Sequence, residues 1–159
     1  MKAAHEVFFS LQRRQLKLAT AESCTGGMVA AAITDIAGSS EVYDRGFVTY
    51  SNAAKIEMLG VPLDLILQHG AVSEEVAIAM AKGAMLHSAA DITVSITGVA
   101  GPGGGSALKP VGLVHFAVAT RLQVLSHVQR YGRLSRAEVR GRAVQFAFEI
   151  VLAQLITEP

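Results

Sequence analysis

The spacing of apolar residues along the chain divides it into helices and strands. Apolar positions that recur every three to four residues predict helices, whereas short apolar or β-branched runs bounded by glycine, proline or serine predict strands. Helices are expected over residues 5–15, 28–36, 53–59, 73–87 and 135–156, with a short helical piece at 62–67. Strands are expected over residues 17–21, 45–51, 91–97, 111–120 and 123–131.

The order of these elements predicts an α/β fold. Helices separate the first three strands, and the last two strands join tightly at residues 121–122, as in an antiparallel hairpin. We therefore expect one domain over residues 1–159, with a mixed, mostly parallel sheet, helices on both faces and a C-terminal antiparallel hairpin. Right-handed crossovers would place the turns at Ser23, Tyr50 and Thr97 at the carboxyl ends of their strands, and parallel neighbours would share that edge.

Composition narrows the class of protein. The 159 residues are 51% hydrophobic and 17% charged, which is typical of a globular chain with a sizeable core. The net charge of +1 provides no broad basic surface for nucleic acid or an anionic membrane, and no apolar run is long enough to span a bilayer. His5 and Glu6 interrupt the N-terminus before the apolar core of a secretory signal could form. The single cysteine, Cys24, fits a reducing cytoplasm, and the scattered histidines form no metal-binding pattern.

Small and hydroxyl-bearing residues mark the turn between the first strand and the helix that follows it. Residues 20–27 are Thr-Ala-Glu-Ser-Cys-Thr-Gly-Gly. A helix start exposes backbone N–H groups, and Gly26 and Gly27 allow a ligand or another segment to approach closely. Ser23 is a candidate nucleophile beside these donors, and Cys24 is its rival because a thiolate is intrinsically more reactive. The alternative is that Ser23 or Thr25 only caps the helix.

A second strand-to-helix turn carries Tyr50 and Lys55. Asn52 is the predicted N-cap of the helix over residues 53–59, and Lys55 follows three residues later, where it can point back toward the sheet edge that carries Tyr50. A lysine acts as a base only when it is neutral, and burial can lower its pKa by several units. The competing interpretations are a solvated helix lysine and a tyrosine packed in the core.

A glycine-rich loop follows the third strand. Residues 98–110 are Gly-Val-Ala-Gly-Pro-Gly-Gly-Gly-Ser-Ala-Leu-Lys-Pro. Backbone N–H groups in such a loop can bind phosphate. This loop matches neither the P-loop nor the dinucleotide-binding pattern, and no helix follows it, so a plain flexible loop is the alternative.

Six motifs, taken together and in this order, carry a resemblance to a known family. They are AESCTGG at 21–27, DIAGSS at 35–40, GFVTYSN at 46–52 with Lys55, GAVS at 70–73, TGVAGPGGG at 97–105 and KPVG at 109–112. Over about residues 5–155 the sequence resembles the C-terminal domain of the CinA family, which is found also as stand-alone nicotinamide-nucleotide amidohydrolases. The resemblance implies a three-layer α/β/α sandwich that forms a homodimer. It also implies hydrolysis of nicotinamide mononucleotide to nicotinate mononucleotide and ammonia. We expect no cofactor and no metal.

The resemblance implies a catalytic group of Ser23, Tyr50 and Lys55. Ser23 would attack the carboxamide carbon, and Lys55 and Tyr50 would share proton transfer, with either of them as the immediate base. Backbone N–H groups near residues 23–27 would form the oxyanion hole, and Asn52 would either orient Lys55 or only cap its helix. The substrate-binding residues expected around this group are Thr25, Gly26, Gly27, Asn52, Thr97, Gly98, Gly101, Gly103, Gly104 and Gly105.

The chain departs from the family pattern where its last helix begins. The usual Gly-Asp-Arg is here Gly-Arg-Leu-Ser-Arg at 132–136, so the acid is missing, although Arg136 and Arg140 keep the arginine spacing. The substrate phosphate has several candidate sites: the helix start at 25–27, the side chains of Lys109 and the two arginines, and the glycine loop at 101–105, which we favour. Two other functions stay open, namely a non-catalytic nucleotide- or partner-binding module and an amidase for another small carboxamide.

Overall fold

A five-stranded sheet forms the centre of the molecule. A computed structural model describes residues 1–157, and its strands lie in the order β2-β1-β3-β4-β5. Their bounds are β1 Leu18–Glu22, β2 Tyr43–Val48, β3 Ile92–Gly98, β4 Leu113–Thr120 and β5 Val124–Arg130. β1 pairs in parallel with both β2 and β3, whereas β4 pairs antiparallel with β3 and with β5. Four strands therefore point the same way and β4 runs against them, which confirms the predicted mixed sheet and hairpin.

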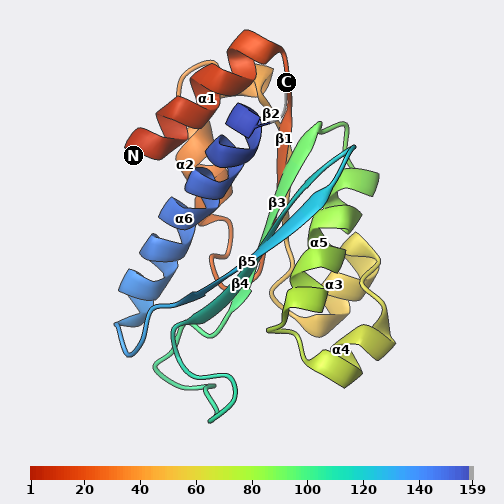
Figure 1. Cartoon of the computed structure of the whole chain (residues 1–159), viewed down its shortest axis with the longest axis vertical. Coiled ribbons are helices and arrows are strands. Elements are labelled where there is room, and N and C mark those ends of the chain that lie inside the picture. Colours follow the sequence, from red (N-terminus) through yellow and green to blue (C-terminus); the bar gives the residue numbers. More distant parts are fainter. Residues whose placement is uncertain (158–159) are drawn as a thin grey trace.

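Helices cover both faces of this sheet (Figure 1). Their bounds are α1 Lys2–Arg14, α2 Met28–Thr34, α3 Asn52–Leu59, α4 Leu63–His69, α5 Glu74–Leu86 and α6 Arg136–Thr157. Helices α1, α2 and α6 lie on one face and α3, α4 and α5 on the other, which confirms the three-layer α/β/α sandwich. Among the described residues, no helix is both long and apolar enough to cross a membrane.

The two faces of the sheet are packed with residues of different size. Large apolar side chains fill the layer between the sheet and α6, for example Ile96, Phe116 and Phe148. The layer beneath α5 contains small residues such as Ala81 and Ala117. The helix α5 backbone can therefore lie close to the strands.

The side chains of β3 follow this division. Ile92, Val94 and Ile96 alternate with three hydroxyl residues, and all six are buried. The hydroxyls of Thr93, Ser95 and Thr97 donate to backbone carbonyls of Ala81, Ala77 and Ala71, at 2.8, 2.5 and 2.8 Å. Because alternate residues of a strand face the same side, one row of hydroxyls holds α5 and the segment before it.

Two predicted boundaries around β2 are wrong. The strand was expected over residues 45–51, but it ends at Val48, so Tyr50 follows the strand. The N-cap of α3 is Ser51, whose side chain accepts a hydrogen bond from the Ala54 N–H at 3.0 Å, and not the predicted Asn52. Serine and asparagine are both good caps, and the turn geometry after Thr49 selects the earlier residue.

Gly83 in α5 provides a test of the close packing on this face. A Cβ atom at Gly83 would collide with the Leu59 backbone at the end of α3, so Gly83→Ala is expected to lower the free energy of unfolding by about 3 kcal/mol. Gly141 in α6 is the matched control, because a Cβ atom there meets no other atom within 4 Å. Gly141→Ala should raise the free energy of unfolding by about 0.5–1 kcal/mol, since alanine favours helices. Urea denaturation of both variants measures this difference, and equal stabilities would contradict the packing.

Candidate active site

The turns that follow β1, β2 and β3 meet at one edge of the sheet. These three strands are parallel neighbours, so their carboxyl ends lie side by side. Ser23 directly follows β1, Tyr50 lies two residues beyond β2, and Thr97 is the penultimate residue of β3. The predicted shared edge is therefore present in the structure.

Ser23 and Lys55 are in direct contact at this edge. The Lys55 Nζ atom lies 3.0 Å from Ser23 Oγ and 2.8 Å from the Thr49 carbonyl oxygen. Lys55 projects from α3 and is only 2% exposed, which contradicts the interpretation as a solvated lysine. The end of β1 and helix α3 thus bring together the hydroxyl of Ser23 and the buried amine of Lys55.

Burial changes the proton affinity of this amine. Removal from water lowers the pKa of Lys55, and the nearby Cys24 opposes that shift only in part. No carboxylate within residues 1–157 forms an ion pair with Lys55. A neutral Lys55 can accept the Ser23 hydroxyl proton while it still donates to the Thr49 carbonyl.

Cys24, the rival nucleophile, lies in the hydrophobic core. Its side chain is buried among apolar residues, and this burial raises the pKa of the thiol to about 11. A thiol with such a pKa stays protonated near neutral pH and is a poor nucleophile. Of the two neighbours, Ser23 is the one in contact with the Lys55 amine.

Glu22 caps the helix that follows the Ser23 turn. Its buried carboxylate accepts hydrogen bonds from the N–H groups of Val29 at 2.9 Å and Ala30 at 3.0 Å. The residue at the N-cap position, Gly27, has no capping side chain, so neither Ser23 nor Thr25 caps α2. Sequence reasoning missed Glu22, although acidic side chains near a helix start are favourable and could have suggested it.

The Ser23 turn leaves some backbone donors free. Within the described chain, the N–H groups of Thr25 and Gly27 donate to no protein acceptor, whereas those of Ser23 and Gly26 donate to carbonyls. The side-chain hydroxyls of Thr25 and Thr49 are also buried, and neither has a hydrogen-bond partner among residues 1–157. Buried polar atoms are normally satisfied, so these groups are available to a bound ligand or an ordered water.

Arg140 on α6 holds the same turn from the other side. Its Nε atom donates to the Cys24 carbonyl at 3.0 Å and its Nη2 atom donates to the Thr25 carbonyl at 3.2 Å. A trans peptide is planar, so the Cys24 carbonyl and the Thr25 N–H point in opposite directions. Arg140 therefore fixes the direction of a free N–H group that lies two residues from Ser23.

Tyr50 lies at the rim of this edge and is 60% exposed, so it is not packed in the core. Its hydroxyl accepts a hydrogen bond from Arg136 Nη2, and Arg136 Nη1 donates to the Gly101 carbonyl at 3.0 Å. Within the described residues, the Tyr50 hydroxyl forms no hydrogen bond with Ser23 or Lys55. The structure thus joins Ser23 to Lys55 directly and joins Tyr50 to the root of the glycine loop.

The remaining predicted site residues have varied surroundings. The Thr97 hydroxyl donates to the Ala71 carbonyl, and a side chain at Gly98 would collide with β4, so both residues have structural roles. Asn52 is exposed as the first residue of α3, and the hydrogen-bond partners of Lys55 are Ser23 and Thr49 instead. No group of three or more histidine, cysteine, aspartate or glutamate residues within residues 1–157 could hold a metal ion.

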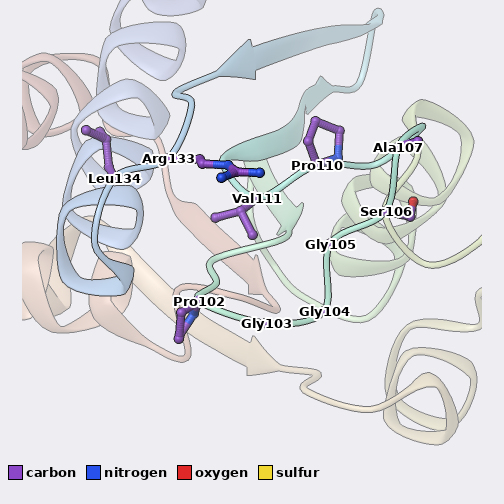
Figure 2. A pocket seen from close by; sticks show the side chains of 10 residues that line it. All are labelled: Pro102, Gly103, Gly104, Gly105, Ser106, Ala107, Pro110, Val111, Arg133 and Leu134. Atoms are coloured by element: carbon purple, nitrogen blue, oxygen red, sulfur yellow. The ribbon is translucent and has the colours of Figure 1, made fainter.

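A cavity of 890 Å³ lies between the glycine loop and the turn that precedes α6 (Figure 2). Its lining residues are Pro102, Gly103, Gly104, Gly105, Ser106, Ala107, Pro110, Val111, Arg133 and Leu134. Ser23 and Lys55 do not line it, but Arg136 connects its border at Gly101 with Tyr50. The cavity is therefore a neighbour of the Ser23 turn and not the same hollow.

Known proteins match both the sequence and the fold. The family model for the CinA C-terminal domain matches residues 1–155. A nicotinamide-nucleotide amidohydrolase PncC from Shigella flexneri is 57% identical over 98% of this chain and 94% of its own length. A CinA-like protein from Colwellia psychrerythraea is 53% identical over 72% of this chain, but the chain spans only 26% of that longer protein. It likewise spans 33% of another long relative, from Caldicellulosiruptor bescii.

A solved structure agrees with these matches. The competence/damage inducible protein CihA from Agrobacterium tumefaciens superposes with a TM-score of 0.94 at 50% identity, over 96% of this chain and 93% of that one. Sequence and fold thus agree over nearly the whole length. The chain belongs to the CinA C-terminal domain family.

Proposed function

We propose that this protein hydrolyses the carboxamide of nicotinamide mononucleotide to nicotinate mononucleotide and ammonia, with Ser23 as the nucleophile. The observation that carries the proposal is the 3.0 Å contact between Ser23 Oγ and the buried Lys55 Nζ. Full-length relatives with the name nicotinamide-nucleotide amidohydrolase support the choice of substrate. Release of ammonia from nicotinamide mononucleotide by the purified protein tests it.

The proposed reaction has two halves. In the first, Lys55 accepts the Ser23 hydroxyl proton as Oγ attacks the carboxamide carbon, and the resulting ammonium returns that proton to the departing ammonia. In the second, water attacks the carbonyl carbon of the acyl ester and gives a proton to Lys55. Lys55 then passes this proton to Ser23 Oγ, which leaves as the free hydroxyl. The Lys55 contact with Ser23 favours lysine as the immediate base. Tyr50, held by Arg136 at the rim, would assist proton transfer to the leaving group.

The negative charge on the carboxamide oxygen needs donors that are already oriented. The free N–H of Thr25 is the best placed candidate, because Arg140 fixes the peptide that carries it. A cation on the carbonyl end of a peptide also polarises its N–H, which strengthens the hydrogen bond to an oxyanion. Gly27 offers a second free N–H in the same turn.

The competing functions predict different results in the same assay. A non-catalytic nucleotide-binding module would bind nicotinamide mononucleotide without releasing ammonia. An amidase for another small carboxamide would neither bind nor hydrolyse this nucleotide. The association of two copies into a homodimer stays a prediction.

The first catalytic prediction separates the two candidate nucleophiles. Ser23→Ala should abolish nearly all ammonia release and still bind the substrate, because only the attacking oxygen is lost. Cys24→Ala should retain most of the activity, because the Cys24 thiol is buried and protonated. The opposite pattern, with an active Ser23→Ala and an inactive Cys24→Ala, would refute the assignment.

The second prediction concerns the charge state of Lys55. The pKa of Lys55 is depressed and the neutral form is the base, so kcat/KM should rise with pH through that pKa and then level off. Lys55→Arg should be about as inactive as Lys55→Met, because arginine does not deprotonate in this range. Activity in Lys55→Arg near the wild-type level would mean that the residue supplies only positive charge.

The third prediction concerns Arg140. Arg140→Met should lower kcat by about tenfold or more with little change in KM, because the Thr25 N–H loses its fixed direction. Arg142→Met, at an exposed position of the same helix, is the matched control and should have wild-type kinetics. Thermal melting shows whether both variants are folded at the assay temperature. A change in KM alone would assign Arg140 to substrate binding instead.

A further inference from the structure

The cavity beside the glycine loop has the electrostatic character of an anion site. Among the described residues that line it, Arg133 is the single charged residue and none is acidic. Within residues 1–157, no carboxylate forms an ion pair with Arg133. Figure 2 shows the Arg133 side chain extending from the turn before α6 toward Val111, across the cavity from the glycines. An unpaired guanidinium is thus directed into an open space.

The glycine loop contributes backbone donors on the opposite side. The N–H groups of Gly103, Gly104 and Gly105 donate to no acceptor in the described chain. Gly104 has a φ of +81°, so the direction of successive N–H groups changes as it does in backbone concavities that bind anions. Cβ atoms at Gly103 and Gly104 would meet no atom of residues 1–157 within 4 Å, so this side of the cavity is open.

Both ends of the loop are anchored. At its root, Arg136 donates to the Gly101 carbonyl at 3.0 Å. At its far end, the Lys109 amine donates to the His69 carbonyl at the end of α4, and Ser106 and Lys109 form reciprocal hydrogen bonds of 2.9 and 3.0 Å. An anchored loop presents its N–H groups in a fixed arrangement. This favours binding because the loop loses little conformational entropy when the ligand binds.

We propose that this cavity binds a phosphate monoester through the Arg133 guanidinium and the N–H groups of Gly103–Gly105. Arginine matches the geometry of phosphate oxygens and stays charged at any working pH. The cavity volume of 890 Å³ is large enough for a phosphorylated sugar. Arg136 links its border at Gly101 to Tyr50, and we assign the 5′-phosphate of the nucleotide substrate to this cavity. Only that last step rests on the proposed function.

The proposal is tested with ribose 5-phosphate, whose binding does not depend on amide hydrolysis. Titration calorimetry of the wild-type protein should detect binding, and Arg133→Met should weaken it about tenfold through the loss of a charge-assisted contact. Gly103→Val should also weaken binding, because the valine side chain would occupy the space proposed for the phosphate. The substitution should leave the fold intact, since a Cβ atom at Gly103 meets no described atom within 4 Å. Arg142→Met is the matched control and should bind as the wild type does.

Substrate kinetics provide the second readout. The ratio of kcat/KM for nicotinamide mononucleotide to that for nicotinamide riboside should fall about tenfold in Arg133→Met, while hydrolysis of the riboside is unchanged. A wild-type protein that does not bind ribose 5-phosphate, or an Arg133→Met variant that binds it normally, overturns the anion site. Ribose 5-phosphate binding that requires Arg133, in a protein that releases no ammonia, would support the anion site and refute the amidase.

Discussion

The structure depends on the lysine side chain of Lys55, which is held away from water and pairs with no carboxylate in the part of the chain that the structure describes. Burial disfavours the charged form of Lys55, so the fold must offer hydrogen-bond partners that suit a neutral amine. The Thr49 carbonyl and the Ser23 hydroxyl are those partners. They come from the ends of β2 and β1, so the parallel pairing of these strands and the capping of α3 by Ser51 together place the amine.

The Ser23 turn is fixed by side chains that come from several parts of the chain. Glu22 ties the turn to the first residues of α2, and Arg140 ties its carbonyls to α6. Arg136, one helical turn before Arg140, connects Tyr50 with the glycine loop. Helix α6 therefore organises the rim of the site, although it contributes no residue to the proposed nucleophile and base. Such fixed surroundings are what a preorganised oxyanion site requires.

Local pattern was sufficient to predict the elements, the class of fold and the meeting of three turns, because hydrophobic spacing and crossover handedness are local or topological rules. Other features depend on contacts between distant residues. The outward position of Tyr50 follows from its hydrogen bond to Arg136, which is 86 residues away in sequence. The cap supplied by Glu22 follows from the path of the chain through two glycines. The cavity at Arg133 depends on the shape of an irregular loop, for which no periodic signal exists.

Two hydroxyl residues that lie two positions apart on β3 bond to carbonyls that lie four positions apart on α5. Two residues of a strand advance about 6.6 Å, and four residues of a helix advance about 6.0 Å, so Thr93 and Ser95 reach carbonyls that are one helical turn apart. A slide of α5 by a fraction of a turn would break both hydrogen bonds at once and leave two buried hydroxyls unpaired. The two hydrogen bonds therefore fix the position of α5 along the direction of β3. A movement that opens the site by sliding α5 along the sheet would therefore be costly, whereas a movement of the loops at the sheet edge would leave both hydrogen bonds intact.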